Sequence, residues 1–580
     1  MTPVQRLLRY FPPYKARLAL GTLCVLAGCL LKPVGPFLLQ RAIDGLTGGV
    51  TNSGLLGYAG LLVLVASIQG ALLFSQRHLF ISTALAIEYD LRNDFYQHLQ
   101  RLPLEFFKAN RTGDLMARAT SDIGTIRTVV GWVTLDSMNT LLSIAIIMPL
   151  AASLSWEFAL LSFLPILAMA ISARFFGGRI RERSEAVQEG LGEVSSRAQE
   201  SLSGVRAIRA CNHEQAEIQS FRQINRDYRV RNVSLIRASA ILYPFLRFFI
   251  ALGFMAVLWH GGNLAIRGKI TIGQFVQLTV YLEYLISPVF QLGYSMDFFQ
   301  RGLVSMRRVH SVMSVTPTIA DSLNPVDLHE IVGQIEFRDL TFKYSGASQP
   351  ALRQINLLIK PGQTVAIVGA VGSGKSTLLN LVARLFDAEP GQVLIDGWPI
   401  RRVPIKLLRS SIGYVTQECF LFSESIAGNI SFGAQQASRR EVEAAAADAG
   451  IAEEIAGFPR GYETIVGERG MTLSGGQKQR TTIARAIIRR PRILMLDDAF
   501  SSVDTYTEGK ILERLRGLMR GRTCLITSNR ISTVKDADLI IVLDGGRIIE
   551  QGTHDELLAR AGFYADLYRK QLLREELSAS

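Results

Sequence analysis

Six apolar stretches occupy much of the chain before residue 300 and leave that part little freedom in how it can fold. Each is about 20 residues long, the length with which an α-helix crosses roughly 30 Å of hydrocarbon. We therefore predict six membrane-spanning helices. They lie near Leu18–Leu39, Leu55–Phe74, Leu135–Leu154, Phe158–Phe176, Ala240–Leu258 and Ile272–Leu292.

The charges beside these stretches predict their orientation. The basic N-terminal segment, with Arg6, Arg9, Lys15 and Arg17, lacks the apolar core of a secretory signal and favours the cytoplasmic side. An even number of crossings returns the chain to that side, so both termini are expected in the cytoplasm, at a bacterial inner (plasma) membrane. The net charge of +13 would also suit nucleic-acid binding, but the arginines gather on segments flanking the spans, which favours a membrane protein without a nucleic-acid partner.

Two long polar segments separate the spans unevenly. Residues 75–134 and 177–239 are each about 60 residues long with helical periodicity, whereas the other connections are short. Two antiparallel helices of about 30 residues would extend each segment roughly 45 Å from the membrane, far enough to contact another domain. At the tip of the first arm, Arg111–Arg118 predicts a new helix start and a transverse helix that docks on a neighbour; the second tip is expected near Cys211–Glu217.

The composition changes after Arg308. A turn-rich segment, Thr316–Pro325, predicts a linker, and strand-like alternation begins at Gln334–Tyr344. We therefore expect a helical transmembrane domain over 1–310, a linker over 311–330 and an α/β domain over 331–580.

A phosphate-binding loop is the clearest functional signal. The apolar run Thr364–Val368 predicts a strand, Gly369–Ser376 follows it, and Thr377–Phe386 predicts a helix. In this context the glycines allow backbone N–H groups to surround phosphate oxygens, Lys375 supplies a positive charge, and Ser376 supplies a hydroxyl for Mg²⁺.

Two further segments complete the nucleotide chemistry. The strand Arg492–Asp497 ends in a carboxylate that can hold Mg²⁺, which completes the two-part arrangement of P-loop NTPases. We therefore expect residues 331–580 to form an α/β P-loop NTPase domain that binds nucleotide. Leu473–Gln477 opens a helix predicted over Lys478–Arg489, and a hydroxyl with two glycines at a helix start is typical of an anion site. If both anion sites lie at opposite ends of one domain, this second site cannot serve the nucleotide of the first loop.

These segments, in this order with Gln417 and Ser501–Asp504, resemble the nucleotide-binding domain of ABC transporters, and the six-span half resembles their exporter type. The resemblance implies that Tyr344 stacks on adenine, Gln417 senses the γ-phosphate and Mg²⁺, and Thr464–Gly470 contacts the transmembrane arms. It implies an ATPase that needs ATP and Mg²⁺ and works as a dimer of half-transporters. The implied nucleotide-binding residues are Tyr344, Gly369, Gly372, Ser373, Gly374, Lys375, Ser376, Thr377, Gln417, Ser474, Gly475, Gly476 and Gln477, and the implied metal-site residues are Ser376, Gln417 and Asp497.

Two positions depart from the family pattern. The residue after Asp497 is normally Glu, the general base, and here it is Asp498; the usual switch histidine is Asn529. A shorter carboxylate retreats from the attacking water by about 1.5 Å, and misplacement of about 1 Å can cost about a hundredfold in rate. Because Ser474–Gln477 is intact, we expect a heterodimer in which this chain's own ATP is hydrolysed poorly; a slow homodimer is the alternative.

The cargo is less well defined. Resemblance to multidrug and lipid exporters implies an amphipathic or apolar compound leaving the cytoplasm, with membrane lipid as surroundings. Import, or a regulatory or channel-like subunit, are alternatives. Glu283, Lys32 and Arg247 are charged residues in predicted spans and form either structural ion pairs or contacts with cargo.

Overall fold

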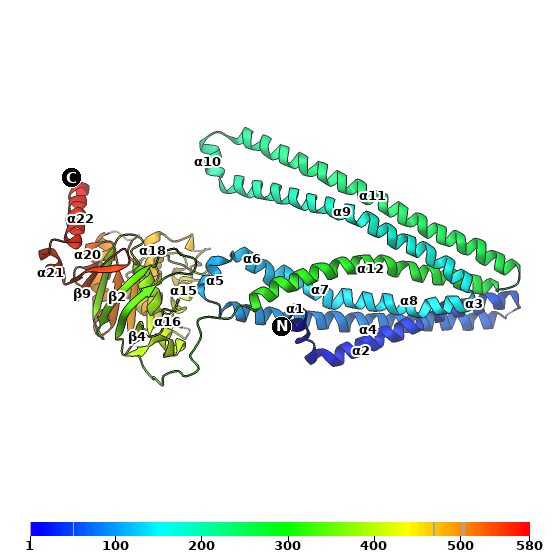
Figure 1. Ribbon diagram of the computed structural model, residues 1–580, viewed down its shortest axis with the longest axis horizontal. Coiled ribbons are helices and arrows are strands. Elements are labelled where there is room, and N and C mark those ends of the chain that lie inside the picture. Colours follow the sequence, from blue (N-terminus) through cyan, green and yellow to red (C-terminus); the bar gives the residue numbers. More distant parts are fainter. Residues whose placement is uncertain (1, 50, 435, 468–469, 502–504, 580) are drawn as a thin grey trace. The chain divides into compact units, whose positions relative to one another are not determined.

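The computed structural model describes residues 2–49, 51–434, 436–467, 470–501 and 505–579. The chain divides into two compact units (Figure 1). Unit 1 comprises Met1–Gln100 and Thr112–Val315, and unit 2 comprises Arg101–Arg111 and Thr316–Ser580.

Unit 1 is built from helices, of which η2 and η3 are π-helical. Their bounds are α1 (Pro3–Leu8), η1 (Pro12–Tyr14), α2 (Lys15–Leu31), α3 (Val34–Thr47), α4 (Asn52–Leu99), α6 (Thr112–Ala117), η2 (Arg118–Asp122), α7 (Ile123–Thr128), η3 (Val129–Val133), α8 (Thr134–Leu154), α9 (Trp156–Ser203), α10 (Val205–Ala210), α11 (Glu214–Ile266) and α12 (Ile272–Met313). Helices cover the six predicted spans, of which the first is divided between α2 and α3 by a break at Lys32 and Pro33. Four described segments are long and apolar enough to cross a membrane, namely Pro12–Leu46, Asn52–Leu99, Thr112–Leu154 and Arg247–Ile266. The remaining two predicted spans lie in α9 and α12, where some side chains fall outside the description.

The predicted second arm consists of α9 and α11, which run side by side and are joined through α10 (Figure 1). Ion pairs tie the two helices together: Arg197 to Glu217 at 2.6 Å and Arg231 to Glu193 at 3.4 Å. Both helices continue without interruption from a predicted span into the arm, so each span and its part of the arm belong to one helix. The tip begins with the short α10, slightly earlier than the predicted Cys211–Glu217.

The first arm departs from the sequence prediction. A helix does start at Thr112, but that helix, α6, belongs to unit 1. The helix that docks on the other unit's fold is α5 (Leu104–Ala109), which precedes the predicted Arg111–Arg118. Pro103 at its N-cap separates α5 from the long helix α4, and the extended Asn110 at its C-cap separates α5 from α6. The proline before Leu104 is the sequence signal for this break.

Polar contacts between helices hold unit 1 in register. The carboxylate of Asp122 accepts hydrogen bonds from Ser305 at 2.9 Å and Arg308 at 2.5 Å, which ties η2 to α12. At the start of α12, Asp44 accepts from the Thr271 hydroxyl at 2.7 Å and the Gly273 N–H at 2.9 Å. A Cβ at position 273 would lie 2.3 Å from the Gln40 carbonyl oxygen, so only glycine permits this approach.

Unit 2 contains a four-stranded antiparallel sheet, order β2-β1-β4-β5, and a six-stranded sheet, order β10-β9-β3-β8-β7-β6. The strands are β1 (Ile335–Phe342), β2 (Leu352–Ile359), β3 (Thr364–Gly369), β4 (Val393–Ile395), β5 (Trp398–Pro399), β6 (Ile412–Val415), β7 (Ile493–Asp497), β8 (Thr523–Thr527), β9 (Leu539–Asp544) and β10 (Arg547–Gly552). The helices are α5, α13 (Lys375–Val382), η4 (Ile400–Arg402), α14 (Ile405–Ser410), α15 (Ile426–Ser431), α16 (Arg439–Asp448), α17 (Ala452–Ala456), η5 (Gly461–Glu463), α18 (Gly475–Ile487), α19 (Thr505–Met519), α20 (Ile531–Val534), α21 (His554–Ala559) and α22 (Phe563–Ala579). The predicted strands at 334–344, 364–368 and 492–497 are confirmed.

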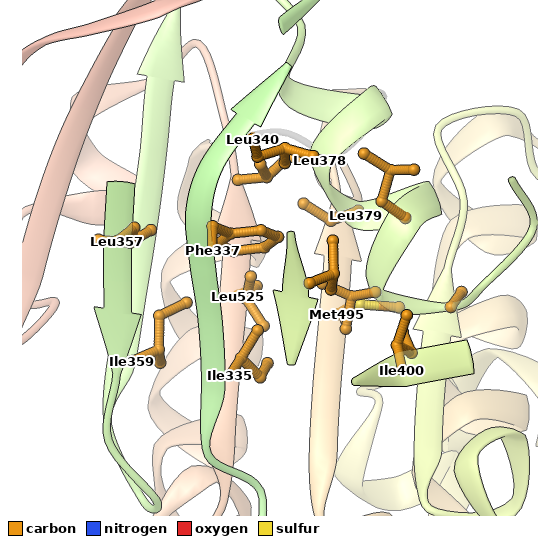
Figure 2. Packing of buried hydrophobic residues seen from close by; sticks show 14 of the residues in the cluster. Ile335, Phe337, Leu340, Leu357, Ile359, Leu378, Leu379, Ile400, Met495 and Leu525 are labelled. Atoms are coloured by element: carbon orange, nitrogen blue, oxygen red, sulfur yellow. The ribbon is translucent and has the colours of Figure 1, made fainter. Parts of the chain in front are cut away.

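One apolar core joins the two sheets through α13. Leu378 and Leu379 of this helix point toward Leu340 and Phe337 of β1 and toward Met495 of β7 (Figure 2). Burying side chains of this size contributes about 1.5–3 kcal/mol each, so this packing fixes the start of α13 firmly. The helix ends earlier than the predicted Phe386, because Arg384 adopts a left-handed conformation with φ of 50°.

Candidate nucleotide-binding site

The candidate site lies where three neighbouring parallel strands end. β8 pairs with both β3 and β7, with Thr527 opposite Ile367 on one side and Asp497 on the other. Because the carboxyl ends of parallel strands share one edge, the loop Gly369–Ser376, Asp497 and Asn529 come together there.

Two glycines of the loop have no room for a side chain. A Cβ on Gly369 would lie 2.1 Å from the Leu543 carbonyl oxygen. Gly374 caps α13 with φ of 106°, and a Cβ there would lie 2.7 Å from Leu352 and 2.8 Å from the Ala351 carbonyl oxygen. The loop therefore passes close to two neighbouring segments and leaves the backbone N–H groups at the start of α13 available for an anion.

Lys375 is half-buried at the first position of α13. Its Nζ donates to the carbonyl oxygens of Gly369 at 2.6 Å and Ala370 at 2.9 Å, so the ammonium is held inside the loop. Burial lowers its pKa from the ordinary value, while Asp498 and Asp497 act in the opposite direction. A cation that has already lost part of its hydration is well prepared to receive phosphate oxygens.

Asp497 links the three strand ends. Its Oδ1 accepts hydrogen bonds from Ser376 Oγ at 3.1 Å and Thr527 Oγ1 at 2.6 Å, and the residue is buried. A hydroxyl and a carboxylate facing one another are oxygen ligands of the kind that Mg²⁺ takes, so the residues present fit this ion. Nearby, the Ser373 hydroxyl is buried and has no described hydrogen-bond partner, which fits a role toward phosphate.

Asp498 takes an unusual backbone conformation, with φ of 48°. Its N–H donates to the Thr527 carbonyl oxygen at 3.1 Å and hydroxyl at 3.0 Å, which fixes the residue beside Asp497. The pKa of Asp498 is raised, mainly by burial and also by the negative charge of Asp497. The positive charges of Lys375 and Arg530 lower it in part. A raised pKa favours proton acceptance, but the short side chain limits the reach of the carboxylate.

Asn529 follows β8 and is exposed. Its carbonyl oxygen accepts a hydrogen bond from Gln571 Nε2 at 2.5 Å, and Gln571 Oε1 accepts from the Ile531 N–H at 2.9 Å. One amide of α22 therefore holds both sides of the loop that presents Asn529. Sequence reasoning missed Gln571, because nothing in its local sequence distinguishes this glutamine from other polar residues of α22.

Tyr344 lies in an aromatic cluster beside the loop. Its ring packs edge-on against Phe342 and Phe386, each with centroids 5.0 Å away, and its hydroxyl donates to Thr377 Oγ1 at 3.0 Å. The ammonium of Lys108, from α5, lies 5.2 Å from the Tyr344 ring centre and 5.3 Å from that of Phe386. This contact of an arm residue was not foreseen.

The remaining predicted residues divide into two groups, Gly372 with Gln417 and the segment Ser474–Gln477. Gly372 lies on the loop with φ of 84°, and Gln417 is exposed directly after β6. Ser474 caps α18: its hydroxyl accepts from the Gln477 N–H at 3.3 Å, and Gln477 Oε1 accepts from the Ser474 N–H at 2.9 Å. The helix starts at Gly475 rather than at the predicted Lys478.

The segment Ser474–Gln477 lies in another part of unit 2 than the phosphate loop. Leu473 packs in a core cluster with α15 and α16 on one face of β7 and β8, whereas α13 after the phosphate loop packs in the core cluster on the other face of these strands. Gln477 Nε2 donates to Glu454 of α17 at 2.9 Å. In the described residues, Ser474–Gln477 thus has its own support, and Gly475 and Gly476 leave the helix start uncovered. Of the other predicted segments, residues 502–504 and 468–469 lie outside the described residues.

Comparisons with known proteins match both halves of the chain. The model of the ABC transporter transmembrane region matches residues 18–289, and that of the ABC transporter family matches residues 352–501. The chain is 35% identical to a probable multidrug resistance ABC transporter ATP-binding/permease protein, YheI, of Bacillus subtilis (strain 168), over 97% of each chain. It is 35% identical to the multidrug resistance-like ATP-binding protein MdlA of Escherichia coli (strain K12), over 96% of this chain and 94% of that one.

A relative named as a lipid A-core flippase and one solved structure are also similar to this chain over nearly its whole length. An ATP-dependent lipid A-core flippase of Syntrophus aciditrophicus (strain SB) is 35% identical over 99% of this chain and 95% of its own. The structure of a bacterial Atm1-family ABC exporter with ATP bound superposes with a TM-score of 0.80 and 30% identity, covering 96% of this chain and 98% of that one.

Proposed function

The chain belongs to the ABC transporters, as an exporter-type half-transporter with a multi-pass transmembrane domain and an ATPase domain, and on this basis we propose that it exports an amphipathic or apolar compound as one half of a heterodimer. In this proposal the ATP held by its own phosphate loop is hydrolysed poorly. The partner's ATP is hydrolysed against Ser474–Gln477 of this chain.

One observation carries the proposal: both departures from the family pattern lie at the same strand edge. Asp498 and Asn529 follow β7 and β8, beside Lys375, whereas Ser474–Gln477 on its separate support keeps the family's residues. Substitutions accumulated at random would change the strand-edge residues and Ser474–Gln477 alike. Loss confined to one half-site favours a division of labour between two different chains.

The side chains suggest how the site works. Lys375 and the N–H groups of the loop would bind the phosphates, and Tyr344 would stack on adenine. Ser376, Asp497 and Gln417 would hold Mg²⁺, which when bound neutralises phosphate charge. Asp498 would accept the proton of the attacking water from too far away, and Asn529 cannot carry the positive charge of histidine.

Closure of two such domains over ATP would move the arms and so reorient the spans. The attachment of α5 to unit 2 supports this, because this short segment of the first arm is part of the ATPase fold. We place the protein in a bacterial inner membrane with both termini in the cytoplasm, as the basic N-terminal flank favours.

The test is ATP hydrolysis by the purified full-length chain. We expect nucleotide binding that depends on Lys375, with slow hydrolysis that Asp498→Asn lowers only slightly. Strong hydrolysis by the chain alone, abolished by Asp498→Asn, would show a working homodimer and refute the heterodimer.

Transport itself needs a second measurement. Uptake of cargo into inverted vesicles that contain both chains should require hydrolysis by the partner. Movement of cargo with ATP binding alone would instead support the channel-like alternative, and movement in the opposite sense would identify an importer.

A further inference from the structure

Lys32 is a charged residue inside an apolar span. It lies at the break between α2 and α3, within the membrane-crossing segment Pro12–Leu46. Ionisable residues in such segments are costly, and they pair with other groups or line a cavity or substrate path. The position of Lys32 therefore calls for an explanation of what compensates its charge.

The described surroundings of Lys32 contain no carboxylate that compensates it. Its Nζ donates to Ser143 Oγ of α8 at 3.4 Å, a long hydrogen bond, and lies 5.1 Å from the ring centre of Tyr284 of α12. Glu283, the nearest acidic residue along α12, is exposed and forms no described ion pair with it. A lysine ammonium has three donors, so the described contacts leave hydrogen-bonding capacity unused.

Three spans contribute polar groups to this place. The Cys29 thiol approaches Ser143 Oγ at 3.8 Å and the Asn139 side-chain oxygen at 3.7 Å. Lys32, Asn139, Ser143 and Tyr284 are named the Lys32 cluster below. Ser143 is buried, while the other three side chains are partly exposed, so a ligand can reach the cluster.

Apolar walls flank the Lys32 cluster on both sides. One core cluster contains Val25, Phe80 and Leu135, and another contains Ile147, Tyr281 and Leu285, with Tyr284 packed against it. A charged group at Lys32 would thus have hydrocarbon surroundings for an attached chain. This combination matches an amphipathic molecule with a negative head.

We propose that the Lys32 cluster is a cargo-binding subsite for the anionic head of an amphipathic compound. The inference rests on the proposed export function and narrows its cargo class. The Lys32 ammonium would form a charge-assisted hydrogen bond with a phosphate, sulfate or carboxylate, and Ser143 and Asn139 would add neutral hydrogen bonds. A cationic head of equal size would be repelled.

The experiment measures equilibrium binding to the full-length protein in nanodiscs of phosphatidylcholine. The probes share a dodecyl chain: dodecyl phosphate is anionic and dodecyltrimethylammonium is cationic. Inorganic phosphate tests the head without the chain, and added phosphatidylglycerol tests whether a bilayer lipid supplies the same chemistry. The variants are Lys32→Met, Lys32→Gln and Lys32→Arg, with Lys269→Met as a matched control in the exposed loop before α12.

We expect the unmodified protein to prefer dodecyl phosphate over the cation and over inorganic phosphate. Lys32→Met and Lys32→Gln should weaken dodecyl phosphate binding about tenfold, with the cation unaffected or tighter, while Lys32→Arg and Lys269→Met retain it. Competition by phosphatidylglycerol would support the proposal with lipid as the source of the head group.

Three results would overturn the inference: no preference for the anion in the unmodified protein, equal binding of inorganic phosphate, or unchanged anion binding in both neutral Lys32 variants. The first two need no variant and so do not depend on variant folding. ATP binding, measured in the same preparations with Lys375→Ala as the blank, tests the transporter function separately. Intact ATP binding without anion preference would therefore refute the subsite alone.

Discussion

Placing a glutamate at position 498, where the family pattern has one, should raise the rate of ATP hydrolysis by this chain. The change Asp498→Glu adds one methylene and extends the carboxylate by about 1.5 Å toward the attacking water. Since misplacement of about 1 Å can cost about a hundredfold, or about 2.7 kcal/mol of barrier, the full gain would be of that size.

The backbone of the structure limits this gain. Asp498 has φ of 48°, a left-handed conformation that Asp and Asn tolerate better than Glu. The extra strain in Glu is about 1 kcal/mol, which offsets part of the benefit. The hydrogen bonds from the N–H of residue 498 to Thr527 remain possible after the change, so the residue keeps its place. We therefore expect a gain of about tenfold to thirtyfold, and a further gain when Asn529→His is added.

The assay is steady-state ATP hydrolysis at saturating Mg²⁺ and ATP, in preparations that gel filtration shows to be dimeric. Asp498→Asn is the matched control, because it keeps the shape of the residue and removes the base. Equal rates in Asp498→Glu, Asp498→Asn and the unmodified chain would refute the argument that the length of this side chain limits hydrolysis.

The contacts of unit 2 lead to three other expected results. Lys375→Ala should weaken ATP binding by at least tenfold, since it removes the half-buried cation of the phosphate loop, and binding of a fluorescent ATP analogue measures this. The raised pKa of Asp498 should move the acid limb of residual hydrolysis to higher pH than an ordinary aspartate would give, because only the ionised form accepts a proton; a pH-rate profile that coincides with that of Asp498→Asn would contradict this. Lys108→Met should speed hydrogen exchange in α5 about twofold to fivefold, matching the loss of about 0.5–1 kcal/mol of cation–π attraction, whereas the exposed neighbour Lys343→Met should leave it unchanged.

Much of the fold could be predicted because its signals are local. The length of the apolar stretches indicates spans, and the strand, loop and helix around Gly369–Ser376 follow from alternation and glycine placement. The ends of helices were less predictable. α13 ends before Phe386 because of the conformation of Arg384, and α18 starts at Gly475 because Ser474 and Gln477 form a capping box; neither depends on hydrophobic periodicity.

The sequence predicts candidate site residues, but it does not predict the contacts that support them. Lys375 and Asp497 have motif neighbours that identify them, whereas Thr527, Gln571 and Lys108 act through contacts with residues far away in the sequence. Thr527 holds Asp497 across the strand pair, and Gln571 approaches the Asn529 loop from α22. Such contacts exist only once the chain has folded, so no sequence pattern reported them.

The position of α5 explains how a nucleotide could influence the membrane domain within one chain. Tyr344 is bonded to Thr377 at the start of α13 and is covered by Lys108 of α5. A purine stacked on Tyr344 would therefore act on a residue that is held by the phosphate loop on one side and by α5 on the other. The segment Arg101–Arg111 that contains α5 is joined to α4 before it and to α6 after it. A shift of the Tyr344 ring would therefore have a short covalent route into two helices of unit 1. Binding of ATP, even where hydrolysis is slow, would then suffice to bias the first arm.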